Sequence, residues 1–246
     1  MSTSKLKNAP LKEVIFELHW ECTTDNVGNL YDAGFDLAQG KFADKLKSSF
    51  PVHRKLIPDN APFKVFGAPI HQYWKAEFGW PVVQHGQGMI AINEIEEGYE
   101  WETSFKPLVL DTIHRLEESY EEVLSIVHVK LQYIDAWEIN EDDPIDFIAQ
   151  KLQTEIRNNY DLPGKLKGIN IQQNFELSDG SIMSLNVSNG INNQNQLPSV
   201  IWTTTVEKQS KIGLTDVVQW LESAHSATSI MFKKMLNPEF YASLDR

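Results

Sequence analysis

The chain has 246 residues, of which 41 % are hydrophobic and 23 % are charged, so it can bury a sizeable core. Its net charge is −12, and because such a surface repels a phosphate backbone, we do not expect nucleic-acid binding. The single cysteine, Cys22, excludes an internal disulfide and fits a reducing compartment. The sequence has no apolar run of signal-peptide or membrane-spanning type, so we expect a cytoplasmic protein without a membrane partner.

Both halves of the sequence predict the same order of elements: strand, helix, two or three strands, long helix. In the first half these elements are a strand at 13–20, a helix at 31–50, strands at 72–78, 81–85 and 88–95, and a helix at 105–126. In the second half they are a strand at 129–139, a helix from 144, strands at 169–177, 182–187 and 200–206, and a helix at 216–236.

Particular residues recur at nearly the same offset in the two halves. Trp20 and Trp137 end the two first strands, and His114 and His225 lie inside the two long helices. We therefore predict an α+β fold made by tandem duplication, with halves 1–127 and 128–246 packed as one unit. An antiparallel meander that buries one face against a long helix is typical of helix-grip and TATA-binding-protein-like architectures, which is an analogy of fold and not of function.

Two short motifs carry a family resemblance. Residues 8–18, Asn-Ala-Pro-Leu-Lys-Glu-Val-Ile-Phe-Glu-Leu, resemble the opening of a sporadically distributed, functionally uncharacterised prokaryotic family with an Ala-Pro-Leu-x-Glu-Val-x-Phe-Glu-Leu motif. The closing helix is similar as well, with Ala-His at 224–225, six residues and then Phe232, while Asn93 and Tyr99 match a middle motif. The resemblance implies a similar fold and supplies no activity. Its patchy distribution implies accessory genes, such as anti-phage defence or toxin–antitoxin modules.

Two histidines are candidate binding residues. His225 lies mid-helix beside the apolar stripe, and His114 occupies the matching position of the first half. Each could be a structural histidine satisfied by a carbonyl or carboxylate, or could contact a ligand or move a proton. His114 and Glu118 share a helix face, which suggests an ion pair, because the second half lacks the matching ligand that a metal centre would need. We predict no metal and no cofactor.

Acidic and aromatic residues supply the other candidates. Alternation along the first strand places Glu13, Glu17 and His19 on one face and the apolar residues on the other, so these polar groups could face solvent, the other half or a partner. Tyr99 and Trp101 lie in an acidic run that could bind a cation or a basic partner, although a solvated connection between strand and helix has the same pattern.

The sequence contains no recognisable catalytic motif, so no catalytic residue is assigned and an enzyme is not the expected class. We predict a non-enzymatic protein that binds another protein as an accessory component of a prokaryotic multi-gene system. The alternative is a small-ligand sensor or enzyme that uses a cavity between the sheet and a long helix, with His114 or His225 at its wall. A homo-oligomer is compatible with either hypothesis.

Overall fold

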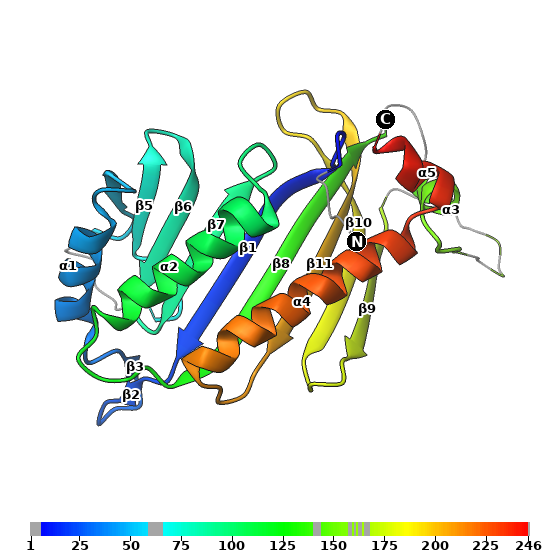
Figure 1. The fold of residues 1–246 in the computed structure, drawn as a ribbon. Coiled ribbons are helices and arrows are strands. Elements are labelled where there is room, and N and C mark those ends of the chain that lie inside the picture. The colour runs from blue at the N-terminus through cyan, green and yellow to red at the C-terminus, as the bar shows by residue number, and fades with distance from the viewer. Residues whose placement is uncertain are drawn as a thin grey trace. The chain divides into compact units, whose positions relative to one another are not determined.

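The computed structural model describes residues 6–58, 66–139, 144–156, 159, 161, 164 and 168–245, and its fold is mixed α+β with a large antiparallel sheet (Figure 1). The strands pair in the order β4-β5-β6-β7-β1-β8-β11-β10-β9. The chain divides into two compact units made of interleaved segments. Unit 1 comprises Met1–Glu13, Gln132–Val206 and Glu222–Arg246, and unit 2 comprises Val14–Leu131 and Glu207–Leu221.

Most of unit 2 comes from the first half of the chain. Its elements are β1 (Leu11–Trp20, shared with unit 1), β2 (Thr23–Thr24), β3 (Leu30–Tyr31), α1 (Phe35–Leu46), β4 (Val52–Lys55), β5 (His71–Ala76), β6 (Gly79–Gly86), β7 (Met89–Ile95), a π-helical turn (Trp101–Phe105) and α2 (Lys106–Glu117). The predicted turn between β6 and β7 is confirmed, and Gly88 adopts the left-handed φ of 71° that favours glycine there.

Helix α1 packs its predicted apolar stripe against the strands of unit 2. Phe35, Ala38, Phe42 and Leu46 recur at steps of three and four residues, and all four are buried. The ring of Phe42 meets the ring of Tyr73 on β5 edge-on, with centroids 5.9 Å apart. Full burial of such aromatic and aliphatic side chains supplies most of the favourable free energy of this unit.

Helix α2 is shorter than the sequence predicts. The helix ends at Glu117 and not near residue 126, and Val123, which lies inside the predicted helix, is 94 % exposed. The prediction was wrong because Tyr120 has another partner: its hydroxyl donates to Asp32 at 2.6 Å, and its ring meets Trp20 edge-on. These contacts draw the chain off the helix axis and toward β8, where Ile126 begins the next strand.

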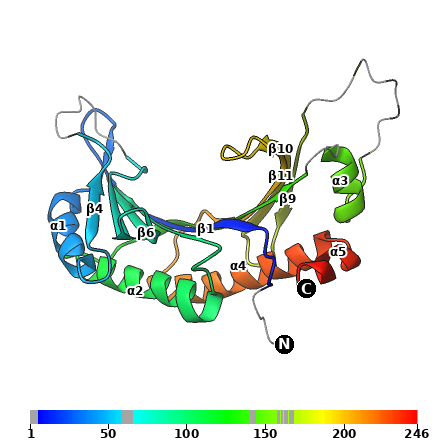
Figure 2. The same cartoon turned by 90° about the horizontal axis from the view of Figure 1, so that it is seen from above.

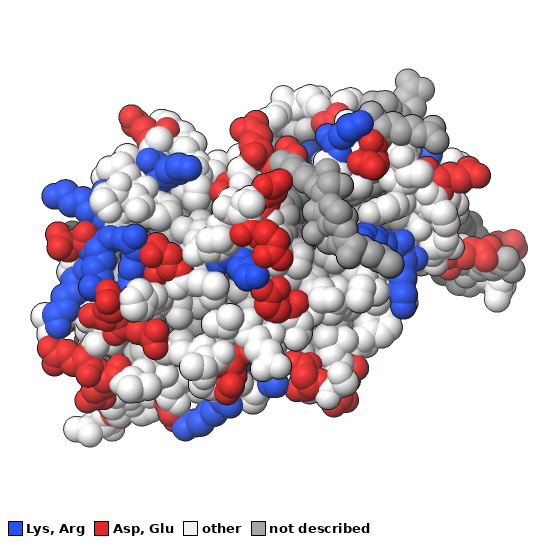
Figure 3. Space-filling view, viewed as in Figure 1, with Lys and Arg blue, Asp and Glu red and all other residues white. Residues whose placement is uncertain are grey.

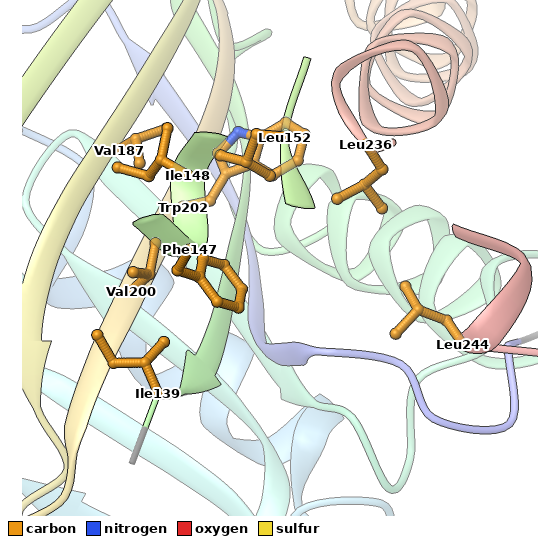
Figure 4. Close-up of a cluster of buried hydrophobic side chains, with 9 residues drawn as sticks. All are labelled: Ile139, Phe147, Ile148, Leu152, Val187, Val200, Trp202, Leu236 and Leu244. Atoms are coloured by element: carbon orange, nitrogen blue, oxygen red, sulfur yellow. The ribbon is translucent and has the colours of Figure 1, made fainter. Parts of the chain in front are cut away.

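Unit 1 contains the elements of the second half. They are β8 (Ile126–Glu138) from Gln132 onward, α3 (Pro144–Lys151), β9 (Asn170–Glu176), β10 (Ile182–Ile191), β11 (Pro198–Lys208) up to Val206, α4 (Leu214–Met235) from Glu222 onward, and α5 (Pro238–Ser243). Its core gathers side chains from strands, α3 and the C-terminal segment (Figure 4): Ile139, Phe147, Ile148, Leu152, Val187, Val200, Trp202, Leu236 and Leu244.

The coarse fold prediction is confirmed, and finer parts of it stay predictions. The α+β class, the antiparallel strands and the long α4 are all present. The predicted boundary between residues 127 and 128 falls inside β8, and neither this boundary nor a duplication is tested by the structure. None of the described helices combines the length and apolar character that crossing a membrane requires.

Candidate interaction site on the helix-free face of unit 2

The two faces of the unit 2 strands are identified by their ring contacts. His85 on β6 lies 4.9 Å from the ring of Phe35 on α1 and 6.2 Å from the ring of Trp20 on β1, measured between centroids. Alternation along a strand then places Gln84, Glu17 and His19 on the opposite face. Figure 2 shows α1 and α2 on one side of these strands. We call the other side, on which no described helix of unit 2 packs, the helix-free face.

Five titratable side chains from three strands form what we call the ion network. Lys130 Nζ on β8 lies 2.6 Å from Glu17 Oε1 on β1, and Glu17 Oε2 lies 3.5 Å from His19 Nε2. The ring of His19 is 5.1 Å from the ring of His128, whose Nε2 lies 3.0 Å from Glu207 Oε2 on β11. The Glu17, His19, His128 and Lys130 side chains are each 21 % exposed, so the network is accessible but largely desolvated.

The neighbours of each group set its protonation. Burial acts to raise the pKa of Glu17, but hydrogen bonds from His19 and Lys130 outweigh it, so this pKa lies below its ordinary value. Burial lowers the pKa of His128 and outweighs the opposing effect of the Glu207 carboxylate. At neutral pH His128 is therefore uncharged and Glu17 is ionised.

A second network, the amide chain, crosses the neighbouring strands on the same face. The Gln72 amide on β5 donates to Gln84 at 2.9 Å, and the Gln84 amide donates to Asn93 on β7 at 2.9 Å. The indole N–H of Trp74 donates to the Gln72 carbonyl at 3.3 Å. The register pairs Gln72 with Gln84 and Trp74 with Val82, which keeps these side chains on one face.

An arginine and three aromatic rings lie at the end of the amide chain. The Arg54 guanidinium on β4 is 5.6 Å from the Trp74 ring and 4.7 Å from the Phe78 ring, and Trp74 packs edge-on against Trp80 at 5.4 Å. Phe78 is 76 % exposed. We call these four residues the Arg54 cluster. Arg54 and Trp74 are half-buried, and arginine and tryptophan are the residue types that dominate binding energy at protein interfaces.

The two predicted histidines lie in different surroundings. His225 on α4 is half-buried, and its Nδ1 lies 2.9 Å from the hydroxyl of Tyr133 on β8, within unit 1. His114 on α2 is 68 % exposed and lies 3.4 Å from Glu118, as an ion pair one helical turn apart. His114 is therefore an exposed surface residue of unit 2, and His225 is a half-buried residue of unit 1.

The remaining predicted residues also separate. Glu17 belongs to the ion network, while Glu13 lies on the part of β1 that belongs to unit 1. Trp101 is buried and its ring is 6.3 Å from Phe105, so it contributes to the core of unit 2. Tyr99 is half-buried with its ring 5.7 Å from the same phenylalanine. The acidic run is thus a packed connection and only partly a solvated one.

Sequence reasoning missed the partners of Glu17 and the Arg54 cluster. His128, Lys130 and Glu207 belong to β8 and β11, and His128 and Glu207 are 79 positions apart in the chain. Alternation along β8 could have placed His128 and Lys130 on one face, which was the one available signal. Their contact with β1 follows from the order of the strands, which local pattern does not contain.

Two potentially reactive side chains of unit 2, His128 and Cys22, have pKa values shifted away from the neutral range. A histidine held by a carboxylate can accept or release a proton, but the lowered pKa of His128 weakens it as a base at neutral pH. Burial, and Asp32 second, raise the pKa of Cys22 to about 12, so its nucleophilic thiolate is scarce. Among the described residues, no group of three or more potential ligands is arranged to hold a metal ion.

A scan against protein-family models and a search of curated proteins both returned no match for this chain.

Proposed function

We propose that the protein is a non-enzymatic binding component that recognises another protein through the helix-free face of unit 2. One observation carries this proposal: the ion network, the amide chain and the Arg54 cluster lie on strands β4, β5, β6, β7, β1, β8 and β11, away from α1 and α2. Ordering long polar side chains costs conformational entropy, and a surface that is already ordered loses less on binding.

The composition of the face fits a protein partner. Hydrogen-bonded amides can exchange partners with a backbone or side chain, while Arg54 and Trp74 supply anchors of the hot-spot type. The whole chain carries a charge of −12, so its field steers a partner with a basic surface and repels an acidic one. We therefore expect a protein with a net basic docking face. The family resemblance supports a partner encoded in the same gene neighbourhood.

The test is copurification of the full affinity-tagged chain with the products of the genes beside its own, at low and at moderate salt. We expect one basic partner to copurify, with affinity that falls as salt rises because charge steering is screened. Arg54→Ala removes the cation of the Arg54 cluster, and Glu207→Lys reverses a negative charge on the helix-free face, so each should weaken the complex with a basic partner by about tenfold or more. A chain that stays alone with every neighbouring product in mild salt overturns the proposal.

A matched control variant lies on the other side of the molecule. Lys45 on α1 forms an exposed ion pair with Glu118 at 2.7 Å, and α1 lies on the side of the unit 2 strands opposite the helix-free face (Figure 2). Glu118→Lys, in that pair, makes the same change in net charge as Glu207→Lys. If it weakens the complex as strongly as the two face variants do, the effect is one of overall charge and the assigned face is wrong.

A second candidate function, binding of a small ligand, is favoured by His85. This side chain is fully buried, and neither ring nitrogen has a hydrogen-bond partner in the described part of the chain. A buried polar group without a partner costs about 1–3 kcal/mol, which a small polar molecule between α1 and the strands would recover. Native mass spectrometry of the purified chain tests it: a retained mass that is lost in His85→Leu supports a ligand, and an unliganded mass overturns this alternative.

We also infer that halves 1–127 and 128–246 arose by tandem duplication with a helix-grip or TATA-binding-protein-like architecture. The order of elements supports this. The first half runs β1, α1, β5, β6, β7, α2 after omission of the short strands, and the second runs β8, α3, β9, β10, β11, α4. The pairing order is equivalent too, because β5-β6-β7-β1 in one half corresponds to β9-β10-β11-β8 in the other.

A further inference from the structure

Strand β9 is an end strand with little of the usual protection against pairing. It pairs with β10 over seven residues, from Asn170 to Glu176, and no other described strand pairs with it. Natural end strands are commonly short or carry lysine, proline or a bulge, which blocks another chain from adding to them. The opposite end strand, β4, follows this rule, because it has four residues and presents Arg54 and Lys55. β9 contains no lysine, arginine or proline, and its one charged residue is Glu176.

The unpaired backbone groups of β9 can be identified. Asn189 N–H donates to Ile169 C=O at 3.3 Å, and Leu177 N–H donates to Ser181 C=O at 2.8 Å, so both bonds continue the register of β9 and β10. Residues bonded to one neighbour alternate with residues bonded to the other in an antiparallel sheet. The odd-numbered residues of β9 therefore bond to β10. The even-numbered ones direct N–H and C=O groups outward: Asn170, Gln172, Asn174 and Glu176.

This edge is complementary to a second copy of itself. In an antiparallel pair with a two-fold axis at Gln173, Gln172 of one copy lies opposite Asn174 of the other, and Asn170 lies opposite Glu176. All of these are even-numbered, so each pair can exchange two backbone hydrogen bonds, about eight in all. Side-chain amides then meet amides on one face, and Ile171 meets Phe175 on the other.

The topology of the first half shows what is absent beside β9. In the pairing order, β9 takes the position equivalent to that of β5, and β5 has β4 on its outer edge. β4 and β5 pair antiparallel through four residue pairs, from Val52 with Trp74 to Lys55 with His71. We propose that β9 is a self-association edge, and that the β9 strand of a second copy of this chain takes the place that β4 takes beside β5.

Charge selects a second copy over the basic partner of the helix-free face. Residues 170–175 carry no charge, so this edge offers nothing for charge complementarity with another protein. Two whole chains of charge −12 repel each other, and salt screens that repulsion. Self-association should therefore strengthen as salt rises, whereas the complex on the helix-free face should weaken, so each of the two proposals can fail without the other.

The experiment is sedimentation velocity on the full chain from low concentration to about 100 μM, at low and high salt, a range suited to a small interface. We expect a reversible dimer that grows with concentration and with salt. Gln173 is exposed and lies opposite its own copy, so Gln173→Lys and Gln173→Glu each place two like charges together and should weaken the dimer by more than about tenfold.

A mixture of the two Gln173 variants tests whether the two copies meet at this residue. An equimolar mixture of Gln173→Lys and Gln173→Glu puts opposite charges at the axis and should restore a dimer that neither forms alone. Gln194→Lys, an exposed change in the 192–197 loop, is the matched control and should dimerise as the unchanged chain does. The proposal is overturned if the chain stays monomeric at every concentration and salt, or if it forms an oligomer whose affinity neither Gln173 variant changes. In the first case a strand of another protein would be the occupant left for this edge.

Discussion

The two faces of the unit 2 strands differ in how far their polar side chains are buried and in whether these side chains have hydrogen-bond or ion-pair partners. On the face toward α1, Phe42 and Tyr73 pack among fully buried rings, and His85 lies there without a hydrogen-bond partner among the described residues. On the helix-free face, Glu17, Lys130 and the other charged members of the network all have partners and keep some exposure. The covered face contributes mainly hydrophobic free energy, while the open face contributes ordered polar groups that add little to stability.

This difference separates stability from function within one set of strands. Substitutions toward α1 should unfold the protein, and substitutions on the helix-free face should leave it folded and affect a partner. Exposed charges over the helices belong to neither group. Figure 3 shows lysine and arginine next to aspartate and glutamate over α1 and α2, where Lys45–Glu118, Lys41–Glu121 and Arg115–Asp111 form surface ion pairs. Such pairs contribute about 0–1 kcal/mol each.

The largest expected effect is on the covered face. Phe42→Ala removes a fully buried ring that contacts Tyr73 and His85, so the free energy of unfolding should fall by about 3–5 kcal/mol. Urea unfolding followed by circular dichroism measures it. The control is Phe78→Ala, whose ring is 76 % exposed and whose loss should cost less than about 1 kcal/mol. Equal losses for the two variants would contradict the assignment of the faces.

The next effect is a pH dependence of stability to which His85 on the covered face should contribute most. Burial, with the charge of His71 second, lowers the pKa of His85 to about 3 from the ordinary 6.5. Stability that requires neutral His85 is therefore complete above pH 6.5 and is lost as the pH falls toward 3. Between pH 8 and pH 5 the loss amounts to about 2 kcal/mol, since each pH unit below the unfolded pKa costs about 1.4 kcal/mol.

The comparison with His85→Leu isolates this contribution. Asp135 acts in the opposite direction, because burial raises its pKa to about 7 and the cost of ionising it appears as the pH rises. The contribution of Asp135 is common to both proteins. From pH 8 to pH 5, the free energy of unfolding of His85→Leu should therefore rise by about 2 kcal/mol relative to that of the unchanged chain. Parallel pH profiles would show that His85 is not held neutral.

A smaller effect should come from the ion network. A double-mutant cycle of Glu17→Gln and Lys130→Met should give a coupling energy of about 1 kcal/mol, because both side chains are 21 % exposed and the pair is partly screened. The cycle is read from thermal or urea unfolding at neutral pH. A coupling above about 3 kcal/mol would place this pair among stabilising buried contacts and remove the contrast between the two faces.

The smallest effect is expected at His114. Its side chain is 68 % exposed on α2 and touches Glu118 across one turn. His114→Ala should change the free energy of unfolding by less than about 0.5 kcal/mol, which urea unfolding can establish. His225→Ala, which deprives Tyr133 of its partner at 2.9 Å, is the comparison and should cost more. The reverse order would mean that His114 has a structural role that its contacts do not explain.

The local sequence pattern correctly predicted which side chains of a single strand or helix are buried. Alternation placed Glu17 and His19 opposite Phe16 and Leu18 on β1, and the three- and four-residue steps of α1 identified its buried face. The end of α2 could not be read, because it depends on a hydrogen bond from Tyr120 to Asp32, 88 positions away. For the same reason the sequence predicted only part of the candidate site. Glu17 was a predicted site residue, but its partners on β8 and β11 depend on the strand order, which the sequence alone does not provide.

The acidic composition of the segment around Tyr99 and Trp101 predicted more solvent exposure than the structure shows. The acidic run near Tyr99 and Trp101 has the pattern of a solvated loop, yet Glu94 and Trp101 are buried, and Glu94 lies within 2.8 Å of the Cβ position that a side chain at Gly98 would occupy. A charge run counts residues and ignores which way each strand position points. Conversely, the composition of β9 gives no sign of a site, although residues 170–175 carry no charge and form the edge proposed for self-association.

The interleaving of the units bears on how this polypeptide is made. Unit 2 includes Glu207–Leu221, and unit 1 includes Met1–Glu13 together with segments from Gln132 onward. Because a ribosome delivers residues in order, strands β5, β6 and β7 emerge long before the last segment that completes their unit. Neither unit is therefore complete until Glu207–Leu221 and Glu222–Arg246 have been synthesised, so we expect the last folding steps of both units to occur late in synthesis.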